Sequence, residues 1–84
     1  MRKIISDEIM YNVYLMNTYS DSCVTLFVTD GDDGCEKPVV ICRGDIKQKS
    51  IYHYETLDAY VYGNQRFIDD SIMKALTILR DENE

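Results

Sequence analysis

The sequence contains no tryptophan, one proline and one histidine among its 84 residues. No stretch comes near the ~20 consecutive apolar residues that a helix needs to cross a bilayer, so membrane insertion is not expected. Common enzyme signatures are also missing, including Gly-x-Ser-x-Gly, His-Glu-x-x-His, the Walker A loop and Gly-x-Gly-x-x-Gly. The lone histidine, His53, lies among tyrosines, where a half-buried polar residue is more common than a catalytic base. We therefore expect that the protein is not an enzyme.

Cysteine is scarce as well, and its spacing fits neither a disulfide framework nor a zinc site. Cys23, Cys35 and Cys42 are odd in number, whereas a small secreted domain usually carries an even set. Structural zinc sites use short Cys-x₂₋₄-Cys pairs, which do not occur here. Residues 1–8 become acidic before any hydrophobic stretch of signal-peptide length. These features predict a cytoplasmic protein with reduced thiols, no metal and no other cofactor, in which Cys23 and Cys42 pack as small hydrophobes.

Basic residues are outnumbered by acidic ones. The chain has 9 Lys and Arg against 15 Asp and Glu, and its net charge is −6. Such a charge repels nucleic-acid phosphates, so direct binding to DNA or RNA is disfavoured. It favours a basic protein partner, and nucleic-acid-binding proteins are common examples of basic surfaces. The alternative is that the charge only keeps a small domain in solution.

The first half of the chain predicts strands. In residues 8–17, alternation and the density of Tyr, Val and Ile favour a strand, although a helical stripe through the same segment is the alternative. Residues 23–29 form the clearest strand, with Val, Leu and Val on one face. The Asp- and Gly-rich residues 30–34 predict a hairpin connection. Residues 38–42 predict the return strand, and their apolar residues on both faces suggest a central strand covered on both sides.

In the second half of the chain, the spacing of the hydrophobic residues changes. Ile51, Tyr54, Leu57 and Val61 fit one face of a helix, whereas residues 59–62 alternate like a strand, and the sequence leaves both interpretations open.

The last segment predicts an amphipathic helix. Asp69 and Asp70 are expected in its first turn and Arg80 near its end, where the helix dipole favours these charges. Residues 80–84 are expected to fray, because their acidic side chains are at the unfavourable end. The apolar stripe consists of Ile68, Ile72, Ala75, Leu76 and Leu79.

Together these elements predict a single α+β domain over residues 1–84. We expect a small antiparallel meander of three or four strands with the C-terminal amphipathic helix packed on one face.

The turn after the clearest strand is the strongest local motif. It carries Asp30, Asp32, Asp33 and Glu36. An EF-hand loop that begins at Asp30 would need different residues at its positions 5, 6 and 12, so a calcium site is not expected. Acidic residues two apart on an extended segment are ~6.6 Å apart, a spacing that allows a row of carboxylates to imitate a phosphate backbone. The alternative is an ordinary hairpin turn, because such turns favour Asp and Gly.

Tyrosine is abundant, with seven residues in the chain. Tyr52, Tyr54, Tyr60 and Tyr62 form pairs two residues apart, and tyrosine is enriched at protein interfaces. Tyrosines also pack at the edges of cores with their hydroxyls in water, which is the alternative here. We single out Tyr60 and Tyr62 as candidate anchors for a partner.

The first hypothesis is therefore a small acidic protein-binding domain. Its most concrete form is a stoichiometric inhibitor of a basic nucleic-acid-binding protein or nuclease. Phage and mobile-element proteins of the anti-CRISPR and anti-restriction type are often this short and acidic, which is an analogy of size and charge. The second hypothesis is a structural module that forms a homo-oligomer through an edge strand or the tyrosines. A third, less favoured, is a metal-binding protein or enzyme that uses His53 with Cys or Asp residues.

Overall fold

A computed structural model describes residues 1–6, 11–31, 37–57 and 65–82. The strands are β1 (Arg2–Ile5), β2 (Tyr11–Thr18), β3 (Cys23–Asp30), β4 (Lys37–Asp45) and β5 (Ser50–Thr56). They are followed by one helix, α1 (Gln65–Glu82).

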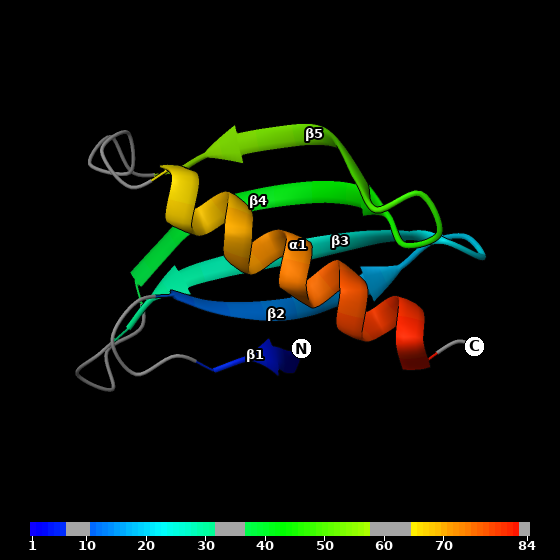
Figure 1. The fold of residues 1–84 in the computed structure, drawn as a ribbon. Coiled ribbons are helices and arrows are strands. Elements are labelled where there is room, and N and C mark those ends of the chain that lie inside the picture. Colours follow the sequence, from blue (N-terminus) through cyan, green and yellow to red (C-terminus); the bar gives the residue numbers. More distant parts are fainter. Residues whose placement is uncertain (7–10, 32–36, 58–64, 83–84) are drawn as a thin grey trace.

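The strands form one five-stranded sheet in the order β1-β2-β3-β4-β5, and every neighbouring pair is antiparallel. Figure 1 shows this meander with α1 lying across one face of the sheet. The α+β class is confirmed. The expected number of strands was too low, because the sheet has five strands rather than three or four.

The two additional strands are the edges of the sheet. No element was expected at residues 2–5, because a four-residue strand that begins with two basic residues carries little hydrophobic pattern. Ile5 nevertheless pairs with Val13 of β2 and contacts the core.

Residues 50–56 form strand β5, so the helical interpretation is wrong for this part of the segment. The register of β4 and β5 shifts between Arg43 and Gly44. Tyr54 pairs with Cys42, and Ile51 pairs with Gly44. The shift places two core-contacting residues three positions apart, a spacing that imitates a helix. Residues 59–62 lie outside the described part of the chain.

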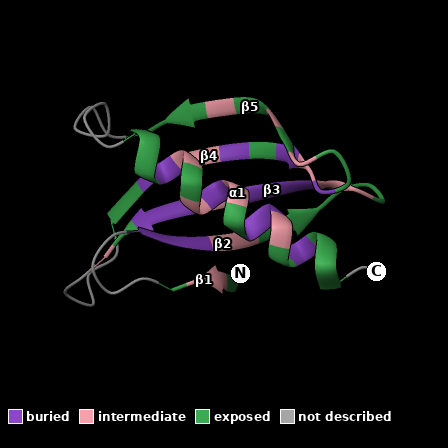
Figure 2. Cartoon of the chain, in the orientation of Figure 1, coloured by how far each residue is buried: buried purple, intermediate pink, exposed green. Residues whose placement is uncertain are grey.

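The core lies between the sheet and α1. The buried residues of α1 are the five that the sequence predicted, Ile68, Ile72, Ala75, Leu76 and Leu79. They belong to one cluster with buried residues of the strands, which include Tyr11, Val13, Val24, Leu26, Val28, Val39, Val40 and Cys42. Figure 2 shows these buried positions along the strands and on the helix. We call the face of the sheet beneath α1 the inner face and the opposite one the outer face.

The start of α1 differs from the expectation. The helix begins at Gln65, so Asp69 and Asp70 lie beyond its first turn, which contains no acidic residue. Arg80 is in the last turn, as expected. Asp81 and Glu82 are helical, and Glu82 accepts a hydrogen bond from Arg2 in an ion pair that joins β1 to the end of α1. Residues 83–84 lie outside the described part of the chain. The described helix is not apolar enough to cross a membrane.

Leu76 of α1 closely approaches Gly44 of β4. A Cβ atom added to Gly44 would lie 2.9 Å from the carbonyl oxygen of Ser50 and 3.4 Å from a methyl group of Leu76. The strand therefore has little room for a side chain at this position, and glycine allows both β5 and α1 to come near.

Candidate functional site

The structure describes one of the residues predicted to bind a partner. Asp30 is the last residue of β3, and its side chain is exposed. Asp32, Asp33, Glu36, Tyr60 and Tyr62 lie outside the described residues.

The described residues next to residues 32–36 and 58–64 in the sequence lie at one end of the sheet. Tyr11 pairs with Asp30, and Asp30 pairs with Lys37. Figure 1 shows that β5 ends and α1 begins at this same end. We call this end, marked by Tyr11, Asp30, Lys37 and Thr56, the acidic end. It is named for the sequence that adjoins these described residues, in which residues 7–10, 32–36 and 58–64 contain Asp7, Glu8, Asp32, Asp33, Glu36 and Asp58.

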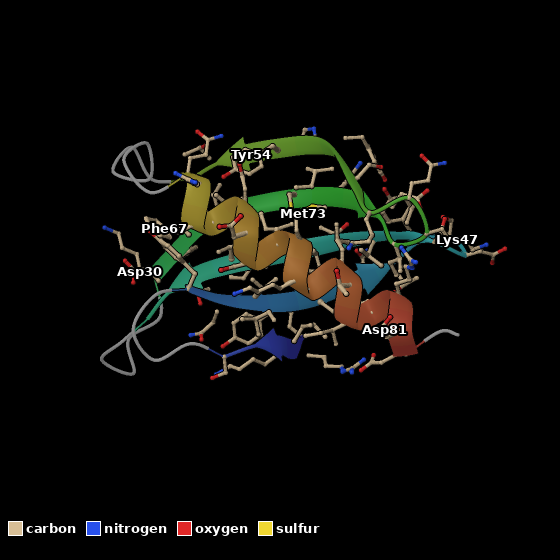
Figure 3. The ribbon with its side chains drawn as sticks, in the orientation of Figure 1. Asp30, Lys47, Tyr54, Phe67, Met73 and Asp81 are labelled. Atoms are coloured by element: carbon tan, nitrogen blue, oxygen red, sulfur yellow. The ribbon has the colours of Figure 1, made fainter. Side chains whose placement is uncertain are left out.

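A group of titratable side chains lies between the inner face and the first half of α1. Burial and the nearby carboxylate of Asp69 raise the pKa of Tyr54 to about 12. The pKa of Cys42 is raised to about 12 by burial first and by Asp69 second. Burial and the charge of Asp70 raise the pKa of Asp69 itself. The Tyr54 hydroxyl, labelled in Figure 3, is buried without a hydrogen-bond partner.

These pKa values describe a protonated phenol and a protonated thiol at neutral pH. A thiol needs its thiolate form to act as a nucleophile or metal ligand, and Cys42 holds almost none. Cys42 is fully buried and belongs to the core, so its predicted role as a small hydrophobe is confirmed. Cys23 is only half-buried.

His53 is more exposed than expected. It lies on β5, where it pairs with Arg43, and its side chain is exposed rather than half-buried. Within the described ranges, no group of three or more His, Cys, Asp or Glu side chains is close enough to hold a metal ion.

The outer face carries a row of side chains that crosses every strand. Pairing in register places Lys3 beside Tyr14, Tyr14 beside Phe27, Phe27 beside Ile41, and Ile41 beside Glu55. We call these residues the outer row. Its apolar members are half-buried, whereas the charged residues at its ends are exposed. The Lys3 ammonium lies 5.5 Å from the centre of the Tyr14 ring, within range of a cation–π contact.

Next to the outer row, the sheet surface is hollowed. The hollow has a volume of about 340 Å³ and is lined by Met16, Asn17, Thr25, Ile41, Arg43, His53 and Glu55. The Arg43 guanidinium at this hollow lies 5.6 Å from the centre of the Tyr19 ring. The lining of the hollow therefore includes both the cationic Arg43 and the acidic Glu55.

The outer face corrects one expectation about β4. The sequence predicted a strand covered on both sides, and β4 is indeed interior in the strand order. Among the described elements, however, only α1 packs on the sheet, and it covers the inner face. Ile41 on the outer face is half-buried. Sequence reasoning missed the outer row because its residues come from five strands and only the register aligns them.

A second hollow of about 510 Å³ lies between β1 and α1. It is mostly apolar and is lined by Ile5, Asp70, Met73, Lys74, Thr77 and Ile78.

Comparison with known proteins identifies no relative. No protein-family model matches the sequence, and no curated protein or solved structure is significantly similar to the chain.

Proposed function

We propose that the protein is a small protein-binding domain that inhibits a basic, nucleic-acid-binding protein. The observation that carries this proposal is that the ends of β3 and β5 and the starts of β4 and α1 lie together at the acidic end. The described residues Asp30 and Lys37 border residues 32–36 there, and β5 and α1 border residues 58–64 at the same end. In the sequence, Asp32, Asp33 and Glu36 follow Asp30, and Tyr60 and Tyr62 lie between Thr56 and Gln65.

The mechanism is steric and electrostatic. Asp30, Asp32, Asp33 and Glu36 face the Lys and Arg side chains of the partner and take the place of nucleic-acid phosphates. Tyr60 and Tyr62 supply contact area, because tyrosine loses little side-chain entropy on binding. The net charge of −6 adds long-range attraction to a basic surface and speeds association.

The biological setting that fits this mechanism is the cytoplasm, where a phage or mobile-element protein meets a host nuclease. Anti-CRISPR and anti-restriction proteins provide the analogy of size and charge. No catalytic step is part of the proposal.

The test compares two variants with the same change in net charge. In one variant, Asp30, Asp32 and Asp33 are changed together to Asn. In the control, Asp21, Asp70 and Asp81 are changed to Asn; these residues are exposed and do not border the acidic end.

Each variant is immobilised and used to capture basic proteins from a lysate of the producing cells or their host. We expect the first variant to bind its partner roughly tenfold or more weakly than the wild type, because each interfacial carboxylate is lost where it faces a cation. The control should bind as the wild type does. Equal binding by the wild type and both variants, with the fold intact by circular dichroism, would show that the acidic turn only connects two strands and does not bind the partner.

A further inference from the structure

The outer row has opposite charges at its two ends and apolar side chains between them. Lys3 lies on one edge strand and Glu55 on the other, and Phe27 lies on the middle strand of the five. Tyr14, Phe27 and Ile41 remain half-buried, whereas three polar residues of the same face, Asn12, Thr25 and Thr29, are buried. No described element covers this face. The half-buried apolar centre of this face is a candidate interface, because grouped apolar side chains on a surface often mark interaction sites.

We propose that a second copy of this chain covers the outer face. The two sheets pack face to face about a two-fold axis that runs parallel to β3 and passes above Phe27. In this arrangement Lys3 of each copy lies opposite Glu55 of the other. Tyr14 lies opposite Ile41 of the second copy, and the two Phe27 rings meet at the axis. The same patch is used by both copies, as in most homodimers.

The charges select this axis over the alternative. A two-fold axis that runs along the outer row, across the strands, would place Lys3 against Lys3 and Glu55 against Glu55. Like charges that face each other across an interface are unfavourable, so the arrangement parallel to β3 is preferred. Packed sheets lie ~10 Å apart, a gap that a lysine and a glutamate side chain can bridge from opposite sides.

The size and composition of the face also suit a dimer. Four strands of about eight residues and the four-residue β1, spaced ~4.8 Å apart, present roughly 550 Å² of sheet surface from each copy. The total of roughly 1,100 Å² exceeds the ~1,000 Å² expected of a biological interface. The centre of the patch is apolar and aromatic, while Arg43, His53 and Asn17 beside it are polar. An apolar centre with a polar rim is the usual anatomy of an interface.

The same face carries aromatic and cationic side chains, and proteins use such side chains to bind single-stranded nucleic acid. The net charge of −6 opposes that occupant, because affinity for nucleic acid depends on neutralising phosphates. A second copy brings its own Glu55 to each Lys3, so the charge pattern of the row favours self-association.

The test is a charge exchange measured by sedimentation equilibrium of the full chain. The wild type should approach twice its 9.8 kDa mass as concentration rises. Lys3→Glu alone and Glu55→Lys alone should each weaken the dimer roughly tenfold, because each creates like-charge contacts at both ends of the row. The double variant Lys3→Glu/Glu55→Lys should recover the wild-type affinity within about threefold. Lys47→Glu and Asp21→Lys are matched controls, exposed and outside the outer row, and should leave the dimer unchanged.

Phe27→Lys provides a second, independent variant, because it places two positive charges at the axis and should leave a folded monomer. The proposal is overturned by a wild type that stays monomeric at millimolar concentration. It is also overturned by a dimer that Phe27→Lys leaves intact, or by single exchanges that the double exchange does not rescue. A monomer that binds a single-stranded oligonucleotide and loses it on Phe27→Lys would assign the face to nucleic acid instead. This inference does not depend on the proposed function, since it concerns the sheet face rather than the acidic end.

Discussion

Cys42 shows how burial decides the chemistry of one side chain. The residue is fully buried between the sheet and α1, and its pKa is raised to about 12 because burial penalises the thiolate. Its thiolate fraction at pH 8 is therefore on the order of 10⁻⁴, too low for a reactive thiol. The sequence alone indicated a core role for Cys42, because a cysteine within an apolar strand is usually buried.

We predict that Cys42 in the folded protein reacts with iodoacetamide at least about a thousandfold more slowly than in the chain unfolded by urea. The rate of Cys42 is followed by mass spectrometry of its peptide, so that modification of other cysteines does not interfere. The residual rate in the folded state should rise with pH up to about 12, since the thiolate is the reacting form. A folded-state rate within tenfold of the unfolded rate at pH 8 would show that Cys42 is accessible.

At the scale of the elements, the sequence predicted what local periodicity encodes. The five inward residues of α1 were all identified, because a helix repeats every 3.6 residues over many turns. The strands β2 and β3 were recognised from alternation and β-branched residues, and β4 was recognised from an apolar run that follows a turn. Strand β5 was ambiguous, because the register shift at Arg43 and Gly44 brings Ile51 and Tyr54 to the core at a helix-like spacing. The outer row depends on register between strands, which no single segment of sequence records.

The packing of α1 can be tested on neighbouring residues of the same helix. Leu76 is fully buried and approaches Gly44, whereas Ile78 is 37% exposed. We predict that Leu76→Ala lowers the free energy of unfolding by about 2–5 kcal/mol, the usual cost of a cavity in a core. Ile78→Ala should change it by about 0.5 kcal/mol or less. Urea unfolding followed by circular dichroism gives both values, and equal losses would contradict a buried Leu76.

For the whole molecule, the sheet separates the surfaces to which we assign binding. The acidic end lies where β3 and β5 end, whereas the outer face is the broad face of the sheet opposite α1. A two-fold axis parallel to β3 leaves the acidic ends of both copies directed the same way. A dimer of this kind would present two acidic ends to one partner and would strengthen binding through multivalency if both sites are within reach.

The composition predicted the charge of the molecule but could not locate it. Of the candidate acidic residues, the structure describes Asp30 alone, at the exposed end of β3. The proposed partner class rests on the net charge of −6 and on the acidic residues that follow Asp30 in the sequence. The function of Tyr60 and Tyr62 stays a prediction.

The most direct measurement is a displacement titration on the captured partner. The protein is immobilised with its bound partner at constant ionic strength, and double-stranded DNA or RNA is added in increasing amounts. If the acidic end occupies a nucleic-acid-binding groove, nucleic acid releases the partner until none remains bound, because both ligands require the same Lys and Arg side chains. Retention of the partner at saturating nucleic acid, with both ligands bound at once, would contradict the account.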